Sequence, residues 1–245
     1  MFNQETKIPK LAIYYIATSN YKMGFDHFKR NLPYFYPEMN KTVVILSDGL
    51  TEWDNVIEGN IIYKTYHIDH FCWPIITLFK MKFILDHQID CDYVCYFNGN
   101  LQFNKDYDYS TNNLNLSKLN VSRHCMCNEE NICDGFDFAG GINRYSQAYI
   151  NESYTYIHGG LFFGPSKIVY KMCEDVSRMV EIDLRGNIIP QWHDESYLNK
   201  WRVMNKDLVA TPKKIINYCY FSPDKPFAVI ETIEKDRRTD KRYFD

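Results

Sequence analysis

The sequence predicts an α/β fold with an open, mostly parallel sheet, and three observations support this class. Short apolar runs that are typical of buried strands alternate with amphipathic segments through the first half of the chain. The run at residues 93–97 is continuously apolar, as a strand covered on both faces must be. The chain has 245 residues, of which 45% are hydrophobic, so it can bury a sizeable core and is not extensively disordered.

The expected elements of the first half follow one another as βαβ units. Strands are predicted at residues 11–16, 42–46, 61–63 and 93–97. Amphipathic helices are predicted at residues 23–35 and from Trp73 to about His87, with Pro74 at the first helical position of the second helix.

The second half is less regular. Residues 104–122 are polar and rich in Asn, and we interpret them as a loop or insertion. The Gly-Gly pair within the aromatic run 156–163 indicates backbone that passes close to a ligand. Residues 165–183 are expected to form a helix that ends at Gly186. We expect a single domain over residues 1–245, with a charged, mobile tail from about residue 234.

Charge and composition exclude several classes of function. A net charge of −3 and a pI near 6.2 argue against a dedicated nucleic-acid binder. The start of the chain has neither a signal peptide nor a run long enough to span a bilayer, so we expect a soluble, cytoplasmic protein. Its eight Cys are scattered and are expected to be mostly reduced. The sequence has no P-loop, no G-x-S-x-G elbow and no H-E-x-x-H motif, which argues against ATPases and hydrolases of those kinds.

Two groups of polar residues are candidates for binding and chemistry. Asn98, Gly99 and Asn100 directly follow the buried strand at 93–97, where open α/β sheets bind ligands, although Asn-Gly is also a common turn signal. Residues 192–201 place two adjacent carboxylates beside Trp and His, which suits a polar substrate and a developing cation. Asp194 is placed to start a helix whose buried side holds Leu198 and Trp201, so the alternative for this second group is a surface helix that Asp194 caps.

Two further groups have simpler explanations. His124, Cys125, Cys127 and Cys133 suggest a zinc site, but the spacing lacks the second ligand pair of a structural zinc site. The basic tail at residues 234–242 is an ordinary solvated segment unless an anionic ligand binds to it.

Residues 192–200 read Trp-His-Asp-Glu-Ser-Tyr-Leu-Asn-Lys, and this motif resembles the signature of glycosyltransferase family 6. The family includes the histo-blood group A and B transferases, the α1,3-galactosyltransferase and small bacterial relatives. Four further blocks are similar and keep the family order, at residues 16–21, 73–80, 146–150 and 156–160. The resemblance covers roughly residues 10 to 225.

The resemblance implies a GT-A fold in a single Rossmann-like domain. It also implies that the transferred sugar keeps its anomeric configuration. The expected reaction moves GalNAc or Gal from a UDP-sugar to a β-galactoside in α1,3 linkage. The animal enzymes hold Mn²⁺ with an Asp-x-Asp motif, whereas Asn98 and Asn100 stand at the matching positions here, as in the bacterial members. Amides are poor ligands for a hard cation, so no divalent metal and no other cofactor is expected. The tail residues Lys235, Arg237 and Arg238 are the expected replacements for the metal at the diphosphate.

The resemblance also assigns roles to single residues. Glu195 matches the catalytic carboxylate beneath the anomeric carbon, either as a transient nucleophile or as electrostatic support for the cation. Lys80 stands where the family has Arg, which keeps the charge but loses the bidentate fork. His124, Trp192 and Glu195 match positions that contact the acceptor. The expected donor-binding residues are Ile16, Ala17, Thr18, Tyr21, Ile76, Lys80, Asn98, Gly99, Asn100, His158, Gly159, Gly160, Asp194, Lys235, Arg237 and Arg238.

The two positions that govern donor choice disagree. Gly160 leaves room for an acetamido group, whereas His158 resembles the galactosyl-transferring members. We expect UDP-GalNAc, with UDP-Gal as the alternative, and a fucosylated H-type acceptor, Fucα1-2Gal, of a bacterial surface polysaccharide. An alternative from another class is a non-catalytic nucleotide-sugar or glycan-binding protein of the same fold. Glu195 argues against it, because binding alone does not require a carboxylate under the anomeric carbon.

Overall fold

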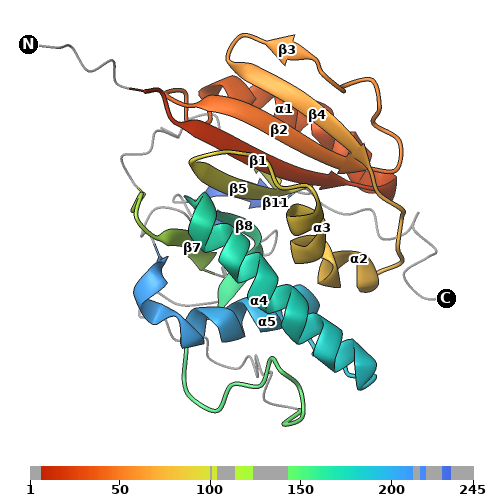
Figure 1. Cartoon of the computed structure of the whole chain (residues 1–245), viewed down its shortest axis with the longest axis vertical. Helices are drawn as coiled ribbons and strands as arrows, with labels where there is room; N and C mark the ends of the chain where they lie inside the picture. Colours follow the sequence, from red (N-terminus) through yellow and green to blue (C-terminus); the bar gives the residue numbers. More distant parts are fainter. Residues whose placement is uncertain are drawn as a thin grey trace, which may run out of the picture.

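The fold is seen in a computed structural model that describes residues 7–99, 101–103, 114–123, 143–211, 216–218 and 228–232. The described strands form one mixed sheet (Figure 1), in the order β3-β4-β2-β1-β5-β8-β7-β10-β11-β6, with β9 paired to β7. The strands are β1 (Lys10–Ala17), β2 (Asn40–Ser47), β3 (Ile57–Glu58), β4 (Ile61–His67), β5 (Tyr93–Asn98), β6 (Leu101–Phe103), β7 (Leu119–Arg123), β8 (Ile157–Pro165), β9 (Val209–Ala210), β10 (Ile216–Tyr218) and β11 (Ala228–Thr232).

The four strands predicted in the first half are all present, and they pair in parallel as β4-β2-β1-β5. Strand β8 pairs antiparallel with both β5 and β7. Because the parallel strands all end at one edge, the loops after β1 and β5 are neighbours there, with Ile16 paired to Asn98. This edge is where an open α/β sheet binds its ligand.

Helices cover both faces of the sheet (Figure 1). The helices are α1 (Phe25–Asn31), α2 (Ile75–Leu78), α3 (Lys80–Asp86), α4 (Ser166–Arg185) and α5 (His193–Met204), with short 3₁₀ turns η1 (Ser19–Gly24), η2 (Leu32–Tyr34) and η4 (Lys206–Leu208). One hydrophobic core lies between the sheet and α1, and the other between the sheet and α3, α4 and α5. Strand β1 supplies both cores, with Tyr14 facing one and Tyr15 the other. This burial on both faces explains its continuous apolar run.

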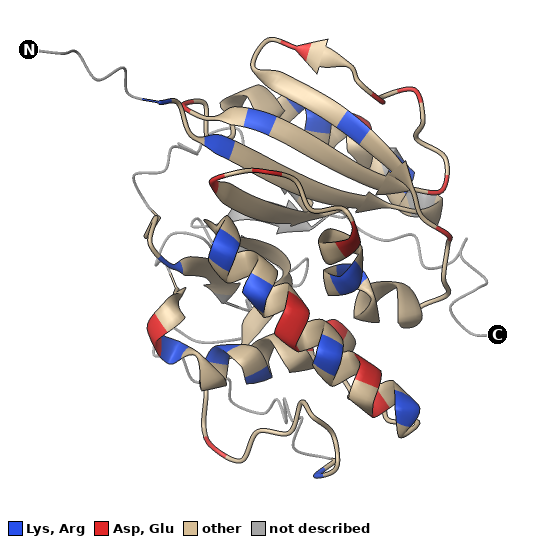
Figure 2. Cartoon of the chain, viewed as in Figure 1, with Lys and Arg blue, Asp and Glu red and all other residues tan. Residues whose placement is uncertain are grey.

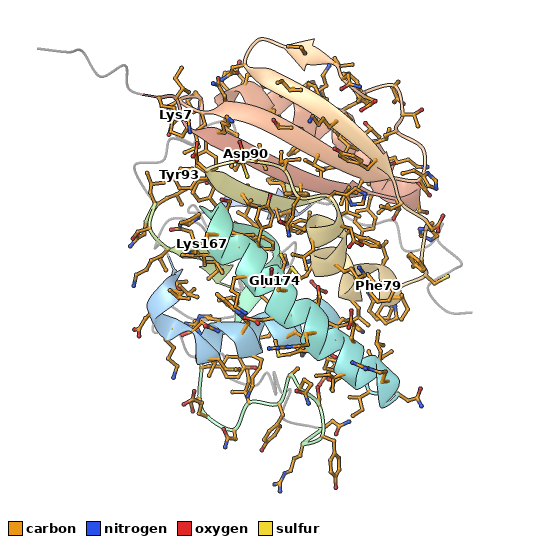
Figure 3. The ribbon with its side chains drawn as sticks, in the orientation of Figure 1. Lys7, Phe79, Asp90, Tyr93, Lys167 and Glu174 are labelled. Carbon is orange, nitrogen blue, oxygen red and sulfur yellow. The ribbon has the colours of Figure 1, made fainter. Side chains whose placement is uncertain are left out.

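Helix α4 has the predicted amphipathic pattern and ends at Arg185, with Gly186 as its C-cap. Val169, Met172 and Val176 are buried against the sheet. Lys and Arg alternate with Asp and Glu on the outer side (Figure 2), and Lys167 and Glu174 point away from the core (Figure 3). The helix is therefore a two-sided layer, with solvent on one side and core on the other.

The two helices predicted in the first half are shorter and interrupted. The segment at 23–35 divides into η1, α1 and η2, and Pro33, which has no backbone N–H to continue the helical bonds, lies in η2 directly after α1 ends. The helix expected from Trp73 begins only at Ile75, since Pro74 is its N-cap and not its first residue. It also breaks at Phe79, immediately before Lys80 turns to β8 and α5.

Two other expectations were wrong in part. The segment interpreted as a loop at 104–122 contains the start of β7 at Leu119, where Leu119 and Val121 are buried under β8 and Asn120 is satisfied by carbonyls. Residues 104–113 lie outside the described residues. The helix at 193 has the expected buried side with Leu198 and Trp201, and Asp194 is buried as well. Asp194 is not its cap: Trp192 is the N-cap, Asp194 is the second helical residue, and its carboxylate is paired with Lys80.

Candidate active site

The candidate site forms where the first turn of α5 meets the start of β8. The amide of Asn199 joins the two elements: it accepts from the backbone N–H of Ile157 at 2.9 Å and donates to the carbonyl of Ile157 at 2.9 Å. The same amide donates to the carbonyl of Glu195 at 2.8 Å. Asn199 is fully buried. Its side-chain amide makes the hydrogen bonds that a neighbouring strand would otherwise make with the backbone of Ile157. Glu195, four residues earlier on the same helix face, is thereby set against β8.

Lys80 forms a buried ion pair with Asp194. Its Nζ lies 2.5 Å from Oδ2 of Asp194 and donates to the carbonyl of Gly159 at 2.8 Å. The ammonium group also faces the ring of Tyr96, with Nζ 4.6 Å from the ring centroid. Because both members of this pair are buried, the ion pair fixes the distance between α3, β8 and the first turn of α5.

Glu195 turns its carboxylate toward β8. Tyr156 donates from its hydroxyl to Oε2 at 2.6 Å, and the backbone N–H of Gly159 donates to Oε1 at 2.8 Å. The Nε2 atom of His158 lies 3.7 Å from Oε1. A Cβ atom on Gly159 would lie 2.7 Å from Cγ of Glu195 and 2.9 Å from Oδ2 of Asp194. The two carboxylates approach β8 this closely only because residue 159 has no side chain.

His158 and Gly160 are in direct contact. The backbone N–H of Gly160 donates to Nδ1 of His158 at 2.8 Å, which leaves the proton of the neutral ring on Nε2, the nitrogen that faces Glu195. A Cβ on Gly160 would lie 2.4 Å from Cε1 of His158 and 3.5 Å from Cβ of Asn98. The space beside Gly160 is therefore filled by the imidazole, and Asn98 lies across it on the neighbouring strand.

The loops after β1 and β5 meet beside this cluster. Tyr15 donates to the carbonyl of Gly99 at 3.3 Å. A Cβ on Gly99 would lie 3.0 Å from Cδ1 of Tyr21 and 3.2 Å from the carbonyl oxygen of Ile16. A side chain at position 99 would separate these loops. The residues Ile16, Tyr21 and Gly99, which the resemblance assigns to nucleotide binding, therefore lie together beside Asn98.

Asp48 anchors the loop after β1. Ser19 has a φ of 52°, in the left-handed region, and its backbone N–H donates to both oxygens of Asp48 at 3.2 and 3.3 Å. Lys22 lies 2.9 Å from the same carboxylate. Burial opposes ionisation of Asp48, but the bonds from Lys22 and Ser19 outweigh it and lower its pKa. The carboxylate therefore holds the loop in its unusual conformation at neutral pH.

Two further aromatic side chains, His193 and Trp192, lie at the start of α5. The ring of His193 packs edge-on against Trp73, with centroids 4.4 Å apart. Burial lowers the pKa of His193 below its ordinary value, and the opposing charges of Asp194 and Glu195 do not reverse this. His193 is therefore neutral at pH 7. Trp192 directly precedes the helix, and its backbone N–H donates to Ser196 at 3.2 Å.

The described part of the donor set does not suit a hard divalent cation. The amide oxygen of Asn98 accepts from Tyr96 at 3.2 Å, and the carboxylate of Asp194 is paired with Lys80. Among the described residues, no group of three His, Cys, Asp or Glu is arranged to hold a metal ion. Divalent hard cations prefer free carboxylates. Asn100 and the zinc candidates His124, Cys125, Cys127 and Cys133 lie outside the described residues.

The structure brings together Lys80, Asn98, His158, Gly159, Gly160, Asp194 and Glu195, with the loop of Ile16, Ala17, Thr18, Tyr21 and Gly99 adjoining them. Ile76 lies on α2, packed against the core beneath α5. Lys235, Arg237 and Arg238 lie outside the described residues.

Sequence reasoning missed two residues of this cluster, Tyr156 and Asn199. The spacing of Tyr156, His158 and Gly160 places them on one face of a strand, and Asn199 follows Glu195 by one helical turn. Either pattern could have indicated them.

This arrangement, an α/β sheet with two adjacent carboxylates at its carboxyl edge, is that of a GT-A-like glycosyltransferase domain. The chain belongs to glycosyltransferase family 6, whose family model matches residues 65–234. It is also similar to the O-antigen biosynthesis glycosyltransferase WbnI of Escherichia coli, with 26% identity over 207 residues that cover 82% of this chain and 85% of that protein. No helix in the described part of the chain is long and apolar enough to cross a membrane.

Proposed function

We propose that this glycosyltransferase transfers GalNAc from UDP-GalNAc to the 3-hydroxyl of a β-galactoside with retention of anomeric configuration. The observation that carries the proposal is the carboxylate of Glu195, held beside the buried Asp194–Lys80 pair at the carboxyl edge of the sheet. A carboxylate that is fixed before the substrate binds stabilises positive charge on the transferring sugar without reorganisation.

Each neighbour of Glu195 has a role in this proposal. Asp194, oriented by Lys80, binds hydroxyls of the donor sugar through the lone pairs that the ammonium leaves free. Ile16, Thr18, Tyr21 and Gly99 hold the uridine in this proposal, and the support is the close approach of Gly99 to Tyr21 and to the carbonyl of Ile16, where the loops after β1 and β5 meet. Trp192 and His124 contact the acceptor.

The proposed donor depends on Gly160. The imidazole of His158 occupies the space next to Gly160, and its Nδ1 accepts from the backbone N–H of Gly160. An acetamido group at this place must displace or stack on the ring, whereas a methyl group on residue 160 would block the space outright. The absence of that methyl group supports UDP-GalNAc over UDP-Gal.

We further propose that catalysis requires no divalent metal. The support is the amide at Asn98, whose oxygen is already bonded to Tyr96, and the amide at Asn100 in the sequence. In this proposal Lys235, Arg237 and Arg238 neutralise the leaving diphosphate.

The proposed acceptor is Fucα1-2Gal in a bacterial surface polysaccharide. The similar protein of Escherichia coli is an O-antigen biosynthesis glycosyltransferase, which supports a polysaccharide acceptor.

The test is transfer from UDP-GalNAc and from UDP-Gal to 2'-fucosyllactose, each with Mn²⁺ and with EDTA. We expect transfer that survives EDTA and is faster with UDP-GalNAc. Transfer only with Mn²⁺ would overturn the metal-free proposal, and faster transfer from UDP-Gal would overturn the donor assignment.

Glu195→Gln separates an enzyme from a binding protein of the same fold. On the enzyme proposal, turnover falls by about 10³-fold while the affinity for UDP stays unchanged, because the carboxylate acts on the transition state. A variant with unchanged turnover would show that Glu195 has no catalytic role.

A further inference from the structure

The carboxylate of Glu195 accepts hydrogen bonds on both oxygens from one stretch of chain. Tyr156, which is 1% exposed, donates to Oε2 at 2.6 Å. The N–H of Gly159, three residues later, donates to Oε1 at 2.8 Å. The bonds from Asn199 to Ile157 fix this stretch against α5. Both bonds orient the carboxylate, which Nε2 of His158 also faces at 3.7 Å from Oε1.

The phenol can act only as a donor in this pair. Burial and the charge of Glu195 raise the pKa of Tyr156 well above its ordinary value, so the hydroxyl stays protonated throughout the working pH range. Hydrogen bonds to the charged form of a carboxylic acid favour that form. A protonated phenol at hydrogen-bonding distance therefore favours ionised Glu195 over neutral Glu195.

We propose that Tyr156 is a positioning residue that keeps Glu195 ionised and aimed at the transferring sugar. This rests on the proposed function, in which Glu195 stabilises the developing cation. Without this bond, Oε2 would lose a donor and lie against the apolar ring at residue 156, so the carboxylate would be easier to protonate and less firmly oriented, although the N–H of Gly159 would still bind Oε1.

Helix α5, which carries Glu195, also carries a matched control for Tyr156. Tyr197 is also buried and donates to a buried carboxylate, Oδ2 of Asp183, at 2.8 Å. Asp183 accepts in addition from Ser146 at 2.6 Å and from the N–H of Gln147 at 2.9 Å, and these bonds tie the segment at 146–148 to α4. Tyr197→Phe thus removes the same type of bond from a carboxylate outside the candidate active site.

The experiment compares Tyr156→Phe with Tyr197→Phe in transfer assays across pH 4 to 9. We expect Tyr156→Phe to lower kcat at least about 10-fold with little change in donor KM, and to move the acidic limb of the kcat profile up by about one pH unit. Tyr197→Phe should lower thermal stability without moving that limb. An unmoved limb in Tyr156→Phe, or equal movement in both variants, would overturn the proposal.

A second readout does not depend on activity. The pKa of Glu195 is measured by NMR in protein carrying ¹³C-labelled Glu, with Glu195→Gln to assign its signal. We expect a higher pKa in Tyr156→Phe and a lower one when 3,5-difluorotyrosine, a more acidic phenol of nearly the same shape, replaces Tyr156. If the wild-type protein transfers no sugar, the proposed function fails, yet these pKa values still decide whether Tyr156 holds Glu195 ionised. An unchanged pKa in both variants would refute the inference even in an active enzyme.

Discussion

Nζ of Lys80 lies 2.5 Å from Oδ2 of Asp194, and both side chains are buried. This pair joins α3 to α5 within the candidate active site. Removing one member leaves the other charge buried without its partner, which costs far more than the loss of an exposed ion pair.

Lys80→Met should therefore lower the free energy of unfolding by about 3 kcal/mol. The control is Lys82→Met on the same helix, which removes an exposed pair with Asp86 at 2.8 Å and should cost about 0.5 kcal/mol or less. Urea unfolding of both variants measures the difference. Similar losses in the two variants would contradict the importance of the buried pair, and partial recovery in Lys80→Met with Asp194→Asn would support it.

Gly159→Ala should damage catalysis more than stability. The new methyl group would lie 2.7 Å from Cγ of Glu195, so the side chain must move and carry its carboxylate out of place. A displacement of this size should lower kcat by about 10²-fold. Gly186→Ala is the control, since its added methyl would meet nothing closer than 3.4 Å. Steady-state kinetics with thermal melts would check this, and a fully active Gly159→Ala enzyme would refute it.

Gly160→Ala should shift donor preference toward UDP-Gal. Its methyl group would overlap the imidazole of His158, at 2.4 Å from Cε1, and would fill the space that the acetamido group needs. The ratio of kcat/KM for UDP-GalNAc to that for UDP-Gal should fall by about 10-fold or more. The same ratio in Gly186→Ala should match the wild-type value. No change in the ratio for Gly160→Ala would mean that the acetamido group lies elsewhere.

Lys41 gives a pH-dependent contribution to stability. It is 1% exposed on β2, and the carbonyl of Met39 accepts from its Nζ at 3.4 Å. Burial lowers the pKa of Lys41 below 10.5, and Glu38 offsets only part of this effect. Between the folded-state pKa of Lys41 and 10.5, the unfolded chain binds more protons than the folded chain, so the free energy of unfolding rises with pH. Below the folded-state pKa, Lys41 is charged in both states and the full cost of burying its charge remains.

Lys41→Met should therefore stabilise the protein most at low pH, and the difference from wild type should shrink as pH approaches 10.5. Denaturant unfolding at several pH values measures it. Lys64→Met, on the neighbouring strand β4, controls for removal of a lysine in general. A difference that is constant with pH would contradict the assignment to Lys41.

The tail should supply the charge that replaces a metal. Lys235→Ala/Arg237→Ala/Arg238→Ala should lower kcat by about 10²-fold and weaken UDP binding, because the leaving diphosphate loses its cations. Lys241→Ala/Arg242→Ala, which removes two positive charges from the same tail, is the control. Calorimetry with UDP and transfer assays together test this, and full activity in the triple variant would assign the neutralisation to other residues.

The sequence by itself predicted the α/β class, the four parallel strands and the family. Continuous apolar runs reveal strands that are buried on both faces, as in β1 and β5, because a single local pattern carries the information. Motifs such as residues 192–200 identify the family for the same reason: their residues are adjacent in the chain.

The tertiary structure alone decided the partners of the site. Lys80 and Asp194 are 114 residues apart, and Tyr156 and Glu195 are 39 apart, so no local pattern pairs them. The break between α2 and α3 at Phe79 directly precedes Lys80, whose bonds to β8 and α5 no local helix preference predicts. Sequence thus determined which groups the protein carries, and packing determined which of them share a hydrogen bond.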